Sequence, residues 1–237
     1  SALPNVFPPY PGRSEFEIYA AMDTAKEVGG DFYDFYFVGE NKLGFLIADV
    51  SGKGIPAAMF MMTAKTIIKG YAESGKPVDE VFTTANEKLC ETNEAGMFVT
   101  AWMGVLDTMT GDVEFANAGH NPPLVRHADG TFEYLRSKHG FVLAGMEGIK
   151  YRKNELHLSA HDEIFLYTDG VTEATNKGGE LYGEDRLLAL LNTLKEMTGE
   201  EICEAVKADL AEFVGDAPQF DDITMLYLKY NGTGTEK

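Results

Sequence analysis

Four acidic segments of this sequence each place an aspartate at the edge of an apolar run, beside glycine or a second acid. Carboxylates at strand ends are held on rigid elements, and several brought together repel one another unless a cation lies between them. Ligand sets made only of oxygen favour Mg²⁺ or Mn²⁺, which pair with phosphate substrates. Each segment alone could be a turn, but four together predict a hard-cation site. The segments are Gly29-Gly30-Asp31, Asp49-Val50-Ser51-Gly52-Lys53-Gly54, Tyr167-Thr168-Asp169-Gly170 and Asp221-Asp222-Ile223-Thr224.

Other reactive patterns in the sequence are incomplete. A phosphate-binding loop, GxxxxGK[ST], would need glycine and Ser or Thr where the chain has Ile47 and Gly54. A serine nucleophile in a GxSxG turn would need glycine at position 49, which is aspartate. The lone His120 lies in a turn and is interpreted as a hydrogen-bonded supporting residue. The methionine-rich run 59–62 is interpreted as core filler rather than as a partner surface.

Composition limits the partners that this chain can have. It has 237 residues, 44% of them apolar, so one domain with a buried core is expected. Its 20 Lys and Arg residues and 38 Asp and Glu residues give a net charge of −18, which disfavours nucleic acid and anionic membranes as partners. The longest apolar run, 55–62, is far shorter than the roughly 20 residues that span a bilayer, and the first thirty residues lack a signal pattern. Cys90 and Cys203 fit neither a disulfide scaffold nor a zinc motif, so a reducing cytoplasm is expected.

Hydrophobic periodicity predicts the elements that position the carboxylates. Alternating or continuous apolar runs predict strands at 15–22, 32–38, 43–50, 98–106, 112–116, 123–127, 132–135, 164–168 and 223–230. Helical spacing predicts helices at 56–71, from Pro77 through Leu89, at 185–195 and at 199–214. The first of these helices is expected to bury Met59, Met62, Ile67 and Tyr71.

The order of these elements predicts an α+β fold. Strands in hairpins interrupted by two pairs of helices indicate an antiparallel β-sandwich of two sheets flanked by helix pairs, in four α-β-β-α layers. Residues 1–12, with four prolines, are expected to be an extended lead-in, 13–230 the folded domain and 231–237 a polar tail. A further segment is expected before the lead-in.

Six motifs follow one another along the chain, from about Leu3 to Tyr230. In this order they resemble the bacterial branch of the PPM metal-dependent protein phosphatases (protein phosphatase 2C-like). That branch contains the stage II sporulation protein E phosphatase domain and the stress-response sigma-factor regulatory phosphatases. Residues 13–230 are therefore identified as a PPM-type phosphatase domain. The motifs are Glu27-Val28-Gly29-Gly30-Asp31-Phe32-Tyr33-Asp34, Ala48-Asp49-Val50-Ser51-Gly52-Lys53-Gly54, Phe98-Val99-Thr100, Ala118-Gly119-His120-Asn121-Pro122-Pro123, Tyr167-Thr168-Asp169-Gly170-Val171-Thr172-Glu173 and Asp221-Asp222-Ile223-Thr224.

The resemblance implies a centre with two Mn²⁺ or Mg²⁺ ions. Asp49 would bridge the ions, Asp31 and the backbone carbonyl of Val50 would bind one side, and Asp169 with Asp221 would bind the other. A water shared by the ions would attack phosphorus in line while the ions neutralise the phosphoryl oxygens. Asp49 and Asp31 are therefore implied to be catalytic, and no phosphoenzyme is required.

Two positions depart from the family pattern or leave it open. Eukaryotic relatives place an acid before the equivalent of Asp31 and a phosphate-binding arginine upstream, where this chain has Gly30 and Lys26. Lys26 is the expected phosphate contact, and its alternative is a solvated surface lysine. The motif favours Asp221 as the ligand over Asp222, which strand alternation puts on the opposite face, but a slip of one residue would exchange them.

The expected function is a metal-dependent serine/threonine protein phosphatase in signal transduction, as the catalytic part of a larger protein with an N-terminal sensor domain before Leu3. By resemblance its substrate is a phosphorylated regulatory protein similar to an anti-sigma factor antagonist. One alternative is a pseudophosphatase that binds such a protein without hydrolysing it. A second alternative is a phosphatase for a small phosphomonoester.

Overall fold

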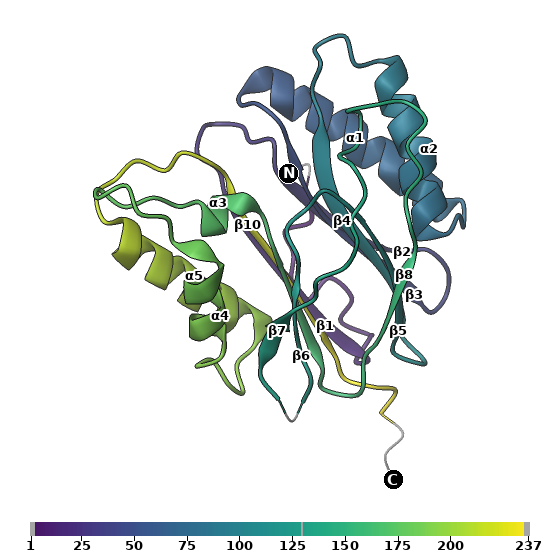
Figure 1. Ribbon diagram of the computed structural model, residues 1–237. Helices are drawn as coiled ribbons and strands as arrows, with labels where there is room; N and C mark the ends of the chain where they lie inside the picture. Colours follow the sequence, from purple (N-terminus) through teal and green to yellow (C-terminus); the bar gives the residue numbers. More distant parts are fainter. Residues whose placement is uncertain (1–2, 129, 235–237) are drawn as a thin grey trace.

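Two five-stranded antiparallel sheets form the centre of the molecule (Figure 1). The computed structural model describes residues 3–128 and 130–234. One sheet has the order β1-β10-β9-β6-β7 and the other β2-β3-β4-β5-β8. The strands are β1 (Phe16–Asp23), β2 (Phe32–Phe37), β3 (Lys42–Val50), β4 (Val99–Asp107), β5 (Asp112–Ala118), β6 (Leu124–Arg126), β7 (Phe132–Tyr134), β8 (Asn154–His157), β9 (Glu163–Tyr167) and β10 (Ile223–Tyr230).

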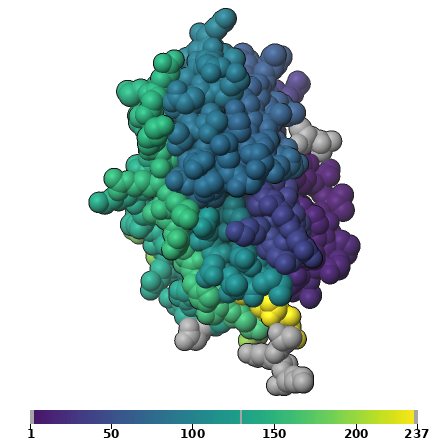
Figure 2. Space-filling view, turned by 90° about the vertical axis from the view of Figure 1, so that its right-hand side faces the viewer, coloured from purple at the N-terminus to yellow at the C-terminus, as the bar shows by residue number. Residues whose placement is uncertain are grey.

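Helices cover the outer face of each sheet, which confirms the predicted four layers (Figure 1). Helices α1 and α2 pack on the sheet of β2 to β5, and their residues, drawn in blue, cover much of one face of the molecule (Figure 2). Helices α4 and α5 pack on the sheet that contains β1, β9 and β10. The helices are α1 (Ile55–Glu73), α2 (Val78–Glu91), α3 (Asp169–Thr172), α4 (Gly183–Leu191) and α5 (Gly199–Val214).

Alternation along the strands decides which side chains face the space between the sheets. In β3, Leu43, Phe45 and Ile47 enter the core between the sheets, whereas the residues between them face α1 and α2. Asp49 continues the first of these rows at the end of the strand. In β10, Leu226 and Leu228 face the same intersheet core. The ends of both strands therefore direct side chains into the mouth of the sandwich.

Helix α1 buries a different face from the one that its large residues predicted. Met59 and Met62 are 68% and 42% exposed, so the interpretation of the methionine run as core is wrong for these two residues. The buried face follows helical spacing and alternates alanines with two larger residues, in the order Ala57, Met61, Ala64, Ile68 and Ala72. Alanines on this face let the helix backbone approach the sheet closely, which leaves the bulkier methionines outside.

Two short elements were not predicted. Strand β8 pairs only with β5, and its side chains are half-buried or exposed, so it has no apolar run to reveal it. Helix α3 has four residues and begins directly after β9. In the described part of the lead-in, Phe7 and Tyr10 pack on aromatic side chains of the first two strands. In residues 3–128 and 130–234, no helix is both long and apolar enough to cross a membrane.

Candidate functional site

The four predicted aspartates lie on segments that end at one mouth of the β-sandwich. Asp31 precedes β2, Asp49 is the penultimate residue of β3, Asp169 begins α3 after β9, and Asp221 precedes β10. Two of these segments belong to each sheet, and the charges of the carboxylates affect one another's pKa values. The tertiary structure therefore brings together the acidic positions that the sequence singled out.

Asp31 is the most deeply buried of these carboxylates. Its side chain lies at the junction of the sheets, and the residue is 2% exposed. The hydroxyls of Thr168 and Thr224 both donate to its Oδ2 atom, at 2.7 and 2.6 Å. Burial, and then the charge of Asp49, raise the pKa of Asp31 well above its usual value, while the two hydroxyl groups oppose this shift. The two threonines thus hold the Asp31 side chain in place and offset part of the rise in its pKa.

Asp49 and Asp169 also carry raised pKa values. Burial, and then the charge of Asp169, raise the pKa of Asp49 to about 7. Burial, followed by the charges of Glu173 and Asp221, raises the pKa of Asp169 to about 6. These groups gain protons readily because their negative charges are close together in a partly desolvated space. A divalent cation between them would relieve the same repulsion.

The two adjacent aspartates before β10 have different environments. Asp222 is 6% exposed, and its two carboxylate oxygens accept hydrogen bonds from the backbone N–H groups of Ala25 and Asp31, at 2.9 and 3.2 Å. The Asp221 side chain is 43% exposed, and one of its oxygens lies 3.3 Å from the Lys53 ammonium. Asp222 therefore holds the loop before β2, while Asp221 presents its carboxylate to the mouth. This geometry favours Asp221 as the ligand.

Two glycines allow that loop to pack against its neighbours. A Cβ atom at Gly29 would collide with the Asp222 carboxylate. A Cβ atom at Gly30 would lie 2.9 Å from the carbonyl oxygen of Val50, the predicted backbone ligand. The absence of side chains here lets the loop approach the end of β3.

Two lysines line a small hollow beside Asp49 and Asp221. Lys26, the predicted phosphate contact, is exposed at its rim. Lys53 lies closer to the carboxylates: its ammonium donates to the Phe220 carbonyl, and its charge lowers the pKa of Asp169. Lys53 belongs to no complete phosphate-loop motif, so the sequence did not predict it as a member of the site. The signal that could have found it was its position inside the second motif.

His120 connects the two sheets behind the carboxylates. Its ring is buried, with Nε2 3.0 Å from the Tyr167 carbonyl and Nδ1 2.9 Å from the Thr100 hydroxyl. A carbonyl can only accept, so Nε2 carries the proton and Nδ1 accepts from the hydroxyl. Burial lowers the pKa of His120 to about 4, and the ring is neutral at pH 7. Because Thr100 pairs with Asp49 across the β3–β4 ladder, this histidine supports strands that carry two of the aspartates.

The donor set fits Mg²⁺ or Mn²⁺, because it consists of carboxylate and carbonyl oxygens. The mutually raised pKa values also show a shortage of positive charge. In the described ranges, no group of three or more His, Cys, Asp or Glu side chains has the spacing of a metal cluster. A shared ion would therefore require side chains such as Asp221, now beside Lys53, to turn toward it.

Comparison with known proteins gives one family match and several relatives. The family model described as stage II sporulation protein E (SpoIIE) matches residues 39–231. Protein IcfG of Synechocystis is 28% identical over 249 residues, which cover 93% of this chain and 39% of that protein. Phosphoserine phosphatase RsbU of Bacillus subtilis is 30% identical over 220 residues, covering 92% of this chain and 64% of RsbU. The chain thus spans between about two fifths and two thirds of the length of these curated relatives.

Solved structures share the fold. The SiaA-PP2C domain of Pseudomonas aeruginosa has a TM-score of 0.80 and 22% identity, covering 90% of this chain and 85% of that one. The PP2C phosphatase domain of SpoIIE from Bacillus subtilis, with a fragment of its regulatory domain, has a TM-score of 0.79 and 18% identity. That match covers 90% of this chain and 63% of the other. At these identities the structures support the two-sheet architecture.

Proposed function

Because this chain belongs to the stage II sporulation protein E (SpoIIE) family of phosphatases, we propose that it hydrolyses phosphoserine or phosphothreonine on a regulatory protein. The observation that carries the proposal is the meeting of Asp31, Asp49, Asp169 and Asp221 at one mouth of the sandwich, with raised pKa values on the first three. A desolvated group of carboxylates that lacks positive charge is suited to divalent ions and to the phosphate that they bind.

In the proposed mechanism the chain holds two Mn²⁺ or Mg²⁺ ions through these four carboxylates and the Val50 carbonyl. Ions held there would supply an activated water and would neutralise negative charge on the phosphoryl group. Thr168 and Thr224 keep the Asp31 carboxylate in one orientation. Lys26, at the rim of the hollow, contacts the substrate phosphate, and Lys53 adds a second positive charge nearby.

The substrate class and cellular setting are also part of this proposal. RsbU and RsbP of Bacillus subtilis are named phosphoserine phosphatases, and the chain is similar to both. We accordingly propose a phosphorylated partner of the anti-sigma factor antagonist type, in the cytoplasm.

A pseudophosphatase is the second candidate. It is favoured by one observation: across the described residues, the acidic side chains do not have the spacing of a metal cluster. Such a protein would bind the phosphorylated partner without releasing phosphate. The presence of all four predicted carboxylates favours the enzyme.

The test is phosphate release from p-nitrophenyl phosphate and from a phosphoserine peptide, with Mn²⁺, with Mg²⁺ and with chelator. We expect turnover that needs the metal and is lost in Asp49→Asn. Absence of turnover with either metal, combined with tight binding of the phosphoserine peptide by the folded chain, would establish the pseudophosphatase instead.

A further inference from the structure

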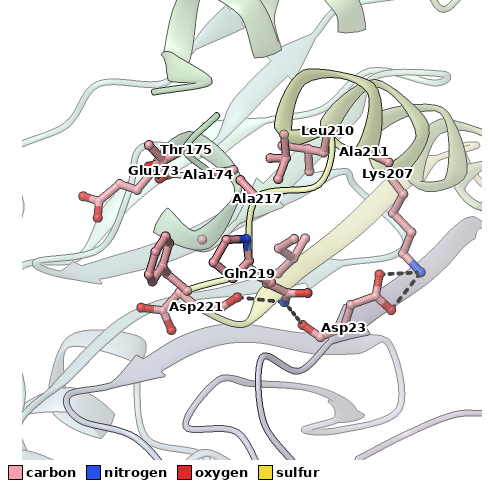
Figure 3. A pocket seen from close by; sticks show the side chains of 15 residues that line it. Asp23, Glu173, Ala174, Thr175, Lys207, Leu210, Ala211, Ala217, Gln219 and Asp221 are labelled. Atoms are coloured by element: carbon pink, nitrogen blue, oxygen red, sulfur yellow. Dashed lines mark hydrogen bonds and ion pairs between the residues drawn. The ribbon is translucent and has the colours of Figure 1, made fainter. Parts of the chain in front are cut away.

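A second cavity lies beside the carboxylates, and the proposed mechanism does not use it. It has a volume of about 320 Å³ and is bounded by the second half of α5, the segment that leads from α5 to β10, and the residues after α3 (Figure 3). We call it the α5 pocket. This volume is at the lower end of the range for ligand cavities, so the pocket suits one side chain better than a large cofactor.

The surface of the α5 pocket is mainly apolar. Side chains from the helix and from the following segment form its wall. Ala211 of the helix and Ala217 of that segment both line the pocket (Figure 3). Phe220, next to Asp221 in the chain, is 64% exposed and also lines it. Exposed aromatic surface of this kind is typical of binding positions. The main apolar lining residues are Leu210, Ala211, Val214, Ala217, Pro218 and Ile223.

The polar groups of the pocket are largely paired with one another. Lys207 and Asp23 form an ion pair at 3.3 Å on one side (Figure 3). The Gln219 amide nitrogen donates to the carbonyls of Asp23 and Asp221, at 2.9 and 2.8 Å. These groups therefore need no polar partner from a ligand. The remaining accessible surface is apolar, and covering it with a nonpolar group is favourable in free energy.

The pocket is continuous with the candidate catalytic site. Asp221 lines both the α5 pocket and the small hollow beside Asp49. Gly170, which follows Asp169, lines the pocket and packs so closely on the Asp222 backbone that a side chain at position 170 would collide with it. A residue close to the phosphorylated one in a bound polypeptide can therefore reach this pocket.

We propose that the α5 pocket binds an apolar side chain of the phosphorylated protein substrate, from a residue that flanks the phosphoserine or phosphothreonine. This inference rests on the proposed function and adds a specificity determinant to it. Charge further defines the occupant: Asp23, Glu173 and Asp221 line the pocket, and Lys207, paired with Asp23, is the one basic residue that lines it in the described part of the chain. An acidic side chain would be repelled, so leucine or phenylalanine is preferred over aspartate.

The experiment measures kcat/KM on a set of phosphoserine peptides in a glycine background. A single leucine, phenylalanine or aspartate is moved through four positions on each side of the phosphoserine, and p-nitrophenyl phosphate serves as the reference substrate. At one or two positions, leucine or phenylalanine should raise kcat/KM about tenfold over glycine, and aspartate should lower it.

Two variants fill the pocket from different sides, Ala211→Phe on α5 and Ala217→Leu on the segment after it. Each should bring the leucine-to-glycine ratio of kcat/KM toward one, with both peptides normalised to p-nitrophenyl phosphate in the same variant. Ala208→Phe is the matched control, because Ala208 is exposed on the same helix and does not line the pocket. It should keep the preference, and thermal unfolding checks that all three variants are folded.

The outcomes separate this inference from the proposed function. Metal-dependent hydrolysis with no apolar preference, or with a preference that both filling variants retain, would overturn the pocket assignment and leave the phosphatase in place. Failure to hydrolyse p-nitrophenyl phosphate as well as every peptide would overturn both. If Ala211→Phe changes the mass of the protein in solution but not its peptide preference, the pocket is instead a contact between copies of the chain, and the assignment is wrong.

Discussion

At the scale of single residues, the two aspartates before β10 have separate roles that substitution can distinguish. Asp222→Asn places an amide N–H against one of the two backbone donors, so we expect a loss of about 1–3 kcal/mol in the free energy of unfolding. Asp221→Asn leaves those bonds intact and should instead weaken Mn²⁺ binding about tenfold or more. Urea unfolding and calorimetric metal titration of both variants test this. The reverse pattern would show that Asp222 is the ligand.

The other site residues differ in how well the sequence predicted them. The carboxylates of Asp31, Asp49 and Asp169 could be predicted because each lies in a short motif at the end of an apolar run. Lys53 lies inside the second motif, which marks its position, but its contacts with the Phe220 carbonyl and Asp221, more than 160 positions away, could not be predicted. No local pattern reports a contact of that range.

At the scale of elements, one buried ion pair connects α1 to β2. The Lys65 ammonium lies 2.9 Å from Asp34 Oδ2, and the two side chains are 15% and 4% exposed. Lys65→Met should lower the free energy of unfolding by about 3 kcal/mol, because it keeps the aliphatic packing but leaves a buried carboxylate without its cation.

The matched control for this pair is Lys69→Met, one turn further along α1. Lys69 pairs with Glu73 at 3.8 Å, and both side chains are more than a third exposed. Exposed pairs contribute at most about 1 kcal/mol. Equal losses of unfolding free energy in the two variants, measured by urea unfolding, would show that the buried Lys65 pair contributes no more stability than the exposed Lys69 pair.

His120 links β4 to the end of β9, and its lowered pKa predicts a pH dependence of stability. In the unfolded chain a histidine has a pKa near 6.5, whereas burial lowers the pKa of the folded His120 to about 4. Below pH 6.5 the unfolded chain therefore binds the proton more readily, and the folded state loses stability as the pH falls toward 4. The stabilisation that comes from the neutral, buried ring is fully present above pH 6.5.

The measurement compares the wild-type protein with His120→Gln by urea unfolding at several pH values between 7.5 and 4.5. The advantage of the wild type should shrink as the pH falls, by up to about 3 kcal/mol near pH 4. The comparison cancels the opposite effect of the raised pKa values of Asp49 and Asp169, which both proteins share. A difference independent of pH would mean that the ring is not buried in its neutral form.

Element prediction succeeded where one face of an element is apolar and failed where the pattern was weak. Helix α5 has the predicted bounds, and its N-terminus has the capping box of Thr198 and Glu201. The buried face of α1 was misjudged because the packing of alanines against a sheet cannot be recognised from side-chain size alone. Strand β8 was missed because an exposed edge strand buries too little to leave a hydrophobic period.

At the scale of the whole molecule, cation binding and stability should be coupled. The carboxylates at the mouth of the sandwich repel one another, so Mn²⁺ should raise the free energy of unfolding, by about 2.7 kcal/mol at a concentration one hundred times its Kd. Asp49→Asn should reduce this effect, and without metal it should be at least as stable as the wild type because one repelling charge is gone. Thermal unfolding with Mn²⁺ and with chelator tests both statements, and an unchanged midpoint would contradict them.

The amino-acid sequence alone predicts the architecture of this protein and the positions of its acidic motifs. Period-two strands, two helix pairs and six ordered motifs predict the sandwich and name its carboxylates, because each of these signals lies within a few neighbouring residues. The tertiary structure decided the contacts between distant segments. It set the hydroxyls of Thr168 and Thr224 on Asp31, tied the Asp222 carboxylate to the loop before β2 and opened the α5 pocket beside Asp221. Those features depend on how strands more than one hundred residues apart meet, which no local pattern specifies.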